Sequence, residues 1–570
     1  MTKRTIIDVP QVRAAMQELL SWQKARIAFD ARLAEEEEYY RLRVRPKSHK
    51  GVDGEDFAPT SAWLVNSILQ KHADLMEHIP TAVCLPREQG DEAAANALSS
   101  ILPVILARSH FEDVYSDNTW YKLKHGVCAY GVFFNKELEN GLGDIDVRRV
   151  ELSNLFWQPN VRDIEASRSV YVVERVDESL LRTRFPHYEG KGVLADFPGL
   201  ESDGESAPRQ VIVVDWYYKK RLADGRTVLH YCKFAGDSVL FASENEEGYE
   251  NGWYEHGQYP FVLDVLYPIE GECTGFGMIA LGRDPQTYID RMDRNLLEYM
   301  DWATRVRFFC KKNTGVNEAD FTDLSRRIVE VEGDLDEERL RQIRVDDLAD
   351  FWLQLKNAKI DELKESTSNR NFSQGATEGG VVAASAIATL QEASNKTVRD
   401  IVAASYRAFL RVVHLVIECV RQFYDASRCF RILGDSGEYH FMYFSNRMIA
   451  DRQTGTLTDG TPIWYHPVFD IDVRAEKRDS YSRISHNETL KDLYKMGAFQ
   501  PENATAASIL LSAMDFSGVA KVRQQVAALA GREAPEAGCL QTTSEKSSDP
   551  LLRAQHEAAA LRQAAAGEVL

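Results

Sequence analysis

Two glycines near the middle of the chain have the spacing of a nucleotide-binding turn. The segment Gly275-Phe-Gly277-Met-Ile-Ala280 reads G-x-G-x-x-A and lies between a predicted strand and a predicted helix. In a dinucleotide site, such glycines let a pyrophosphate approach the backbone where a helix starts. Here Pro268 and Gly271 separate the strand from the motif, and no parallel strand with a ribose-binding acid follows in register. The context therefore favours a flexible start to a helix over nucleotide binding.

Other patterns that support catalysis are missing from the sequence. No G-x-x-x-x-G-K-[ST], H-E-x-x-H or G-x-S-x-G motif occurs, which argues against a P-loop, a zinc-protease centre and a hydrolase elbow. His414 lies in an apolar helical stretch and fits a hydrogen-bonded core histidine better than a metal ligand. Asp144 and Asp146 alternate on one strand, a pattern more typical of a solvated face than of a catalytic acid pair. We therefore expect no enzyme activity, no cofactor and no metal.

Size and charge narrow the class of protein. The 570 residues exceed what one hydrophobic core holds, so about two to four domains are expected. The chain has 68 basic and 87 acidic residues, a net charge of −19. Because tight nucleic-acid binding uses a basic surface, static DNA binding is disfavoured, whereas a channel through which DNA slides is compatible. Cysteines without any C-x-x-C, no signal peptide and no apolar run of membrane length indicate a cytoplasmic protein with reduced thiols.

The longest predicted element is a helix that follows a loop of small residues. The loop contains Gly375, Gly379 and Gly380, which permit backbone angles closed to other residues. Apolar residues then recur every three or four positions, and no Pro or Gly interrupts residues 384–425. About forty residues would make a rod of roughly 60 Å at about 1.5 Å per residue. Such a rod needs a large partner surface, either in this chain or in neighbouring copies.

The rest of the chain alternates between helical and strand-rich regions. Helices are predicted at 10–43, 61–78, 91–107 and 111–125, and three short ones at 487–496, 502–514 and 518–529. Strands rich in Val, Ile, Tyr and Phe are predicted at 127–134, 144–150, 170–175, 211–219, 227–234 and 261–267, and later at 428–433, 439–444 and 468–473. Helical crossovers between the strands are mostly missing, so we expect antiparallel sheets and an α+β fold.

Two predicted helices flank a small charged segment in the middle of the chain. The first covers about 285–306, and the second runs from 346 to about 367 with Trp352 among its buried residues. The segment between them contains a predicted strand at 327–331 and a charged run at 332–341. Because the second helix leads into the glycine loop and the long helix, this order of parts is the most informative feature of the sequence.

In this order of parts the chain resembles the portal proteins of tailed bacteriophages, over most of residues 60–530. The segment GATEGGVVAASAIATLQEAS, which starts at Gly375, looks like the tunnel loop of that family leading into its long wing helix. Residues 277–300 are similar to the start of a stem helix. The segment Gly143-Asp-Ile-Asp-Val-Arg-Arg-Val, together with Asn154-Leu-Phe-Trp-Gln-Pro159, is similar to the wing sheet of the family.

The resemblance implies a portal-type fold and a ring, typically of twelve copies, at one vertex of the capsid. A separate terminase pumps DNA through the ring, and the DNA later leaves by the same route. The implied parts are a mixed wing at 1–274, a helical stem at 275–306 and 346–367, a small α/β clip at 307–345, a tunnel loop at 368–384, the long wing helix and wing sheet at 385–480, and a helical crown with a C-terminal tail at 481–570.

The resemblance also suggests residues for each task. The tunnel loop would line the DNA channel with Arg370, Asn371, Gly375, Glu378, Gly379 and Gly380. Weak phosphate contacts from the second stem helix would come from Lys356, Lys359 and Lys364. These lysines fit equally well as surface charges paired with Asp361 or Glu365. Clip residues that would bind terminase and then tail adaptors are Lys311, Lys312, Glu337, Glu338, Arg339 and Arg341.

The implied partners are further copies of the chain, the large terminase, the major capsid and scaffolding proteins, head–tail adaptors and double-stranded DNA that passes without sequence recognition. We expect no membrane partner. The implied location is the virion, at a capsid vertex, and the host cytoplasm during assembly. Two alternatives stay open at this point. One is another oligomeric connector of the virion, and the other is a nucleotide-binding enzyme that uses Gly275 and Gly277.

Overall fold

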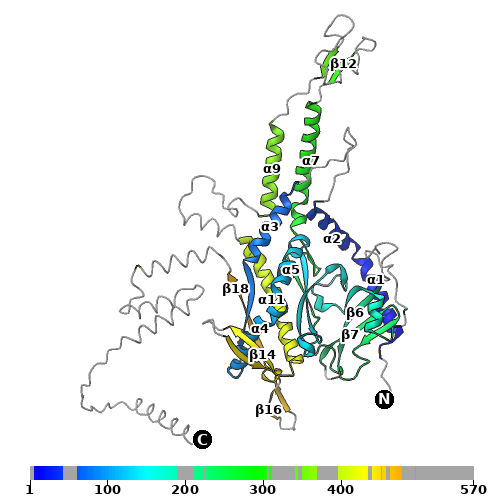
Figure 1. The fold of residues 1–570 in the computed structure, drawn as a ribbon, viewed down its shortest axis with the longest axis vertical. Coiled ribbons are helices and arrows are strands. Elements are labelled where there is room, and N and C mark those ends of the chain that lie inside the picture. Colours follow the sequence, from blue (N-terminus) through cyan, green and yellow to red (C-terminus); the bar gives the residue numbers. More distant parts are fainter. Residues whose placement is uncertain are drawn as a thin grey trace, which may run out of the picture. The chain divides into compact units, whose positions relative to one another are not determined.

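The computed structural model of the chain describes residues 6–42, 61–188, 190, 210–223, 225–304, 307–310, 340–343, 350–368, 396–433, 439–450, 452–456, 462–477 and 495. The chain divides into two compact units, Met1–Leu433 with Tyr439–Arg478, and Gly434–Glu438 with Asp479–Leu570. All elements described below belong to the first unit (Figure 1). Every strand pair in the described residues is antiparallel, which confirms the α+β class. Apart from Lys495, which is helical, the helices predicted after residue 485 lie outside these residues, as does the strand predicted at 327–331.

Two antiparallel sheets form the strand-rich region, with the strand orders β3-β2-β9 and β4-β5-β6-β7-β8. All six strands predicted between residues 127 and 267 are present. The two edge strands β4 and β8 were not predicted, because three and five residues are too few to show an alternating pattern. The bounds are β2 (Val127–Asn135), β3 (Asp144–Val150), β4 (Leu155–Trp157), β5 (Ser169–Asp177), β6 (Gln210–Arg221), β7 (Thr227–Ala235), β8 (Ser238–Ala242) and β9 (Phe261–Val265).

The N-terminal region forms two helices, α1 (Val9–Ala25) and α2 (Ile27–Tyr40), where the sequence predicted one helix over 10–43. The break is at Arg26. Its guanidinium donates to the carbonyl oxygens of Leu152 and Leu155 in and beside the turn η3 (Leu152–Asn154). α1 lies along the sheet that contains β6 and β7, and the two share one core cluster (Figure 1). A single side chain, anchored to a distant turn, thus redirects the helix.

Helices α3 (Trp63–Met76), α4 (Glu92–Arg108) and α5 (Phe111–His125) confirm three predicted helices, and Pro103 lies inside α4 without ending it. The strand β1 (His78–Pro86) was not predicted, because Pro80 and Pro86 indicated the end of a helix. β1 pairs with β18 (Phe469–Lys477) in a two-stranded sheet. Each strand of such a sheet keeps one free edge, where a proline removes no ladder hydrogen bond.

The long helix α11 (Lys396–Phe423) is central to the core. The sequence predicted a helix over 384–425, and residues 384–395 lie outside the described residues. Val412, Val413, Val416 and Val420 are fully buried in the largest core cluster, which also contains residues of β2 and β9. The apolar periodicity therefore indicated the right face and explains why this helix lies against the sheet.

Shorter elements complete the unit. Among them is one short α-helix, α6 (Glu178–Arg184). The others are pairs of strands: β10 (Tyr267–Pro268) with β11 (Gly275–Phe276), β12 (Arg307–Cys310) with β13 (Leu340–Ile343), β14 (Arg428–Leu433) with β15 (Tyr439–Phe444), and β16 (Arg452–Thr456) with β17 (Pro462–Tyr465). Further turns of 3-10 helix are η1 (Gln89–Asp91), η2 (Glu139–Gly141), η4 (Ile164–Ala166) and η6 (Asn446–Met448). The strands predicted at 428–433, 439–444 and 468–473 are thus confirmed.

Candidate functional site

The glycine motif packs against the protein's own backbone. Helix α7 (Met278–Thr304) begins directly after β11, which carries Gly275. A Cβ atom at Gly277 would lie 2.2 Å from the carbonyl oxygen of Lys124, and one at Gly275 would lie 2.4 Å from that of Tyr267. The space that a pyrophosphate would need beside these glycines is therefore filled by main chain. Their role is close packing of β11 against the end of α5, and the nucleotide-binding alternative has no support here.

Helix α9 (Phe351–Ser366) packs beside α7 and runs in the opposite direction (Figure 1). At one end of the pair, Ile289, Ile360 and Leu363 are buried in a core cluster with residues of α3, α5 and α11. Towards the other end, large apolar side chains are exposed. These are Leu297 and Met300 on α7, and Phe351, Trp352 and Leu353 on α9. The expectation that Trp352 is buried is wrong within one chain, where its side chain is 45% exposed.

The C-terminal end of α9 is held by α3. The ammonium of Lys71, a buried side chain, donates to the carbonyl oxygen of Ser368 over 3.3 Å and lies 3.7 Å from Asp74. Thr367 donates from its hydroxyl to the carbonyl oxygen of Leu363 over 2.8 Å. A cation at a helix C-terminus interacts favourably with the helix dipole and with unpaired carbonyl groups. These contacts fix the point at which the chain leaves α9.

A buried ion pair fastens α11 to its neighbours. The Lys122 ammonium on α5 donates to Asp264 on β9 over 2.7 Å and to the Ser405 hydroxyl on α11 over 2.8 Å. Both charged side chains are almost completely buried. Removing either partner would leave an uncompensated charge inside the protein. The pair therefore joins three elements that are far apart in the sequence.

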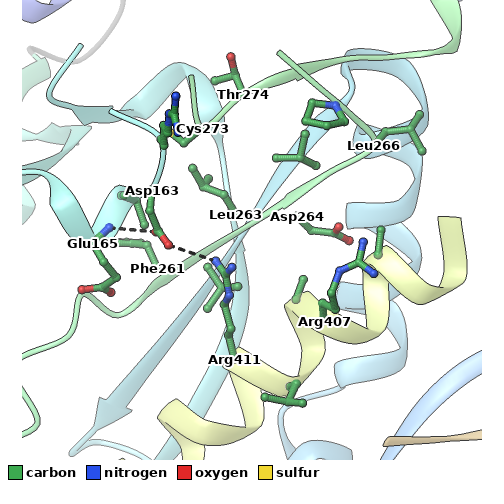
Figure 2. A pocket seen from close by; sticks show the side chains of 18 of the residues that line it. Asp163, Glu165, Phe261, Leu263, Asp264, Leu266, Cys273, Thr274, Arg407 and Arg411 are labelled. Atoms are coloured by element: carbon green, nitrogen blue, oxygen red, sulfur yellow. Dashed lines mark hydrogen bonds and ion pairs between the residues drawn. The ribbon is translucent and has the colours of Figure 1, made fainter. Parts of the chain in front are cut away.

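A groove of about 820 Å³ lies between the turn around η4, the strand β9 and the helix α11. Figure 2 shows Arg407 and Arg411 on α11 facing this groove, with Asp163 and Glu165 on the opposite side. The Arg411 guanidinium lies 3.7 Å from the Asp163 carboxylate. Both acidic and basic side chains line the groove, so it has no strong preference for an anion or a cation.

The groove lacks the arrangement of a catalytic centre. Burial raises the pKa of the Cys273 thiol to about 12, so this thiol stays protonated and is a poor nucleophile near neutral pH. Asp264, which also lines the groove, is committed to Lys122. In the part of the chain that the structure describes, no three His, Cys, Asp or Glu side chains gather in the manner of metal ligands.

A model of the family described as Phage P22-like portal protein matches residues 72–569. The match covers most of the chain. The chain belongs to the P22-like phage portal proteins. None of the curated proteins matches it.

Membership identifies the chain as a portal protein, a structural component of the phage virion at the capsid vertex through which DNA is packaged. Portal proteins of this kind form homo-oligomeric rings that associate with the capsid and connect head and tail. The family decides against the alternatives of a different connector and of a nucleotide-binding enzyme. Among the described residues of this portal protein, no helix is long and apolar enough to span a bilayer.

The three predicted channel lysines of this portal protein all lie on α9. Lys356 pairs with Asp293 of α7, and the Lys359 ammonium lies 2.6 Å from Glu362. The Lys364 ammonium lies over the Trp63 ring, 5.7 Å from its centroid. Lys359 therefore pairs with an acid on the surface of its own helix, as predicted, but the acid is Glu362 and not Asp361 or Glu365. Lys356 instead joins the two helices.

Most other predicted site residues of the portal protein lie outside the described residues. They are Lys311, Lys312, Glu337, Glu338, Arg339, Arg370, Asn371, Gly375, Glu378, Gly379 and Gly380. Arg341 lies on β13, where its backbone pairs with Phe309 of β12. Whether these residues bind DNA, terminase or adaptors stays a prediction.

Sequence reasoning missed the buried charges of this portal protein. Lys122 and Asp264 gave no signal, because each is the other's partner and they are 142 residues apart in the sequence. Asp144 was interpreted as part of a solvated face, which is wrong. It is buried, accepts a hydrogen bond from the Tyr424 hydroxyl and lies 3.2 Å from Arg108.

Proposed function

We propose that twelve copies of this portal protein close into a ring in which α7 and α9 form the wall of the channel. The observation that carries this proposal is the row of exposed Phe, Trp, Leu and Met side chains at one end of the α7–α9 pair. Single exposed apolar residues are ordinary, but a cluster on two packed helices is a typical interaction surface. In a closed ring with heterologous contacts, each copy covers this surface of its neighbour.

The proposed division of the chain keeps the boundaries that the sequence suggested. Residues 1–274 and 385–480 form the wing, 275–306 and 346–367 the stem, 307–345 the clip, 368–384 the tunnel loop and 481–570 the crown and tail. The antiparallel pairing of β12 with β13 supports the clip, because it brings the two ends of residues 311–339 together at the end of the stem.

DNA is proposed to slide through the ring during packaging by a separate terminase and again during ejection. The surplus of acidic over basic residues supports sliding, since acidic surfaces repel phosphate. Lys359 and Lys364 would make brief phosphate contacts that their internal partners weaken. Replacing both by Gln should slow DNA packaging, while Lys220→Gln on β6 should not. Equal packaging rates for the three proteins would remove these lysines from the proposed channel.

Clip residues are proposed to bind the large terminase first and tail adaptors afterwards. The capsid and scaffolding proteins are proposed to surround the wing during assembly in the host cytoplasm. The variant Arg339→Glu with Arg341→Glu should lose terminase binding in a pull-down assay. Arg13→Glu, far from the clip in the sequence and paired with Asp237 on the surface, is the control. Unchanged terminase binding by the clip variant would contradict this assignment.

The ring itself is tested by electron microscopy of the purified chain. End-on views should show annular particles with twelvefold symmetry and a central channel. A stable monomer at every concentration and salt condition would contradict the proposal. A closed ring of a different copy number would correct only the stoichiometry.

A further inference from the structure

Helix α7 pairs its acids inside the protein and leaves two arginines over. Asp290 accepts hydrogen bonds from the segment before α3, and Asp293 pairs with Lys356 of α9. Arg291 is exposed and Arg294 is half-buried. Neither arginine has a hydrogen-bond or ion-pair partner among the described residues. We call these two arginines the basic stripe of α7.

Helix α9 does the opposite. Its three lysines each contact a side chain of a neighbouring helix region: Lys356 and Lys359 contact α7, and Lys364 contacts Trp63 of α3. Its acids after residue 360 point to solvent. We call these exposed acids the acidic stripe of α9, and they are Asp361, Glu362 and Glu365. In the part of the chain that the structure describes, Asp361 has no hydrogen-bond or ion-pair partner.

Each stripe lies on the outer side of its helix. At about 100° of rotation per residue, the basic stripe lies about 140–160° round α7 from the buried Ile289. The acidic stripe lies about 100–160° round α9 from the buried Ile360. Helix α2 covers the start of this side of α7, where the Tyr39 hydroxyl lies 3.2 Å from that of Thr287. The basic stripe begins one turn later, and the acid Glu298 follows beyond it on the same side.

The two stripes also lie at similar heights. The contacts that Lys356 and Lys359 make with α7 place Arg291 level with the segment between these two lysines. Asp361 lies two to five residues further along α9, which is about 3–8 Å at about 1.5 Å per residue. Helical side chains lean towards the N-terminus of their own helix, and in an antiparallel pair this brings the two charges closer in height. Copies related by rotation about an axis along the pair would keep these heights.

This distribution of charge favours one kind of contact between copies. A two-fold dimer brings the same face of both copies together, so it would oppose arginines with arginines or acids with acids. A contact between α7 of one copy and α9 of the next opposes bases with acids. Such a heterologous contact leaves one unmatched stripe at each end of the assembly, and further copies can add until the ring closes.

We propose that the basic stripe of each copy lies against the acidic stripe of the next copy, and that these charges set the direction in which copies add. The inference rests on the proposed ring and deepens it. Exposed apolar side chains of α7 and α9 supply most of the affinity, because exposed ion pairs contribute little. The stripes act on the choice of faces, since opposed like charges disfavour the wrong contact.

The test exchanges the charges in full-length chains and counts rings by electron microscopy. Arg291→Glu with Arg294→Glu makes both stripes acidic, and Asp361→Lys with Glu365→Lys makes both basic. Expressed alone at about 0.1 M salt, each variant should form at least about tenfold fewer rings than the wild type, because every contact opposes like charges. Co-expression of the two variants should restore at least about half of the wild-type rings, because each contact again joins bases to acids.

Two controls and a salt series separate charge from misfolding. Arg13→Glu with Arg184→Glu changes the net charge equally at exposed positions on α1 and α6 and should match the wild type. Arg291→Lys with Arg294→Lys keeps the charge and should match it too. Rings of the reversed variants should partly return at about 1 M salt, where the screening length falls from about 10 Å to about 3 Å. A misfolded chain would not recover.

Each outcome decides between distinct conclusions. Wild-type numbers of rings in both reversed variants would overturn the inference, and so would a co-expressed mixture of folded variants that forms none. Should a reversal lower the unfolding temperature, Arg291→Gln with Arg294→Gln decides instead. Its rings should respond less to salt than those of the wild type, and an unchanged response would overturn the inference. Failure of the wild type to form rings would contradict the proposed function itself.

Discussion

Helix α11 and the α7–α9 pair are both rich in apolar side chains, but they differ in where those side chains find partners. On α11, Val413 and Val416 are fully buried by strands and helices of the same chain. On α9, Phe351 is 62% exposed and Leu353 is 52% exposed. The first helix is complete within one chain. The second shows a surface that a single chain does not cover.

This contrast separates folding from assembly. The burial of α11 explains how one copy acquires a stable core, since burial of apolar surface is the main favourable term in folding. The exposed side chains of α7 and α9 contribute little to that stability and are available for contacts between copies. The anchored end of the pair, where Leu363 meets α3 and α11, joins the two regions. Substitutions of the same type should therefore have different effects on the two helices.

The largest expected effect is on α11. Phe409→Ala removes a side chain that is 2% exposed and should lower the free energy of unfolding by about 3–5 kcal/mol. Phe351→Ala removes the same atoms from an exposed position and should change the free energy of unfolding by about 0.5 kcal/mol or less. Denaturant unfolding of the dissociated chain at low concentration measures both. Similar losses in the two variants would contradict the distinction between the helices.

Loss of the buried ion pair should lower the free energy of unfolding by nearly as much. Lys122→Met leaves Asp264 uncompensated in the core and should cost about 3–5 kcal/mol of unfolding free energy, because the carboxylate loses its cation. The double variant Lys122→Met with Asp264→Leu should recover most of this loss. Arg13→Met, which breaks an exposed pair with Asp237, should lower the stability far less, because solvent screens that pair. If the double variant is as unstable as Lys122→Met alone, the uncompensated charge is not the cause.

A smaller effect concerns the pH dependence of stability that arises from the buried His256. The backbone N–H of Gln258 donates to the His256 Nδ1 over 3.1 Å, which requires an unprotonated nitrogen. Burial and the neighbouring His414 and Lys219 lower the pKa of His256 to about 4. Between about pH 6.5 and 4 the unfolded chain therefore binds a proton that the folded chain does not, so stability falls as the pH falls.

The variant His256→Asn keeps an acceptor but does not titrate. Its denaturant midpoint should fall less than that of the wild type between pH 7 and pH 5, while the two proteins behave alike between pH 7 and pH 8. A wild-type pH profile retained in the variant would assign the dependence to other groups.

Local patterns predicted much of the fold, and long-range contacts account for what they missed. The apolar spacing of α11 and the alternation of β2, β3 and β5 to β7 were sufficient, because each pattern reports burial of one face. β1 was missed because its prolines are typical helix stops, and only pairing with β18 makes it a strand. The break at Arg26 depends on the carbonyl groups of Leu152 and Leu155, which lie 126 and 129 residues further along the chain.

The candidate site shows the same limit. The sequence identified α9 and its lysines, but the partner of Lys356 is Asp293 on another helix, which no spacing within α9 could indicate. Trp352 was expected to be buried because the amphipathic pattern does not distinguish a surface covered by the same chain from one covered by another copy. Only the structure of a single chain shows that this surface is exposed.

The most direct test of this account is the particle mass of Leu353→Asp, measured beside the wild type and Leu180→Asp by analytical ultracentrifugation. Both aspartates replace exposed leucines, one on α9 and one on α6. The account predicts rings for the wild type and for Leu180→Asp, and folded monomers for Leu353→Asp, because a charge on the α7–α9 surface opposes its burial between copies. Rings of wild-type mass and stability in Leu353→Asp would contradict it.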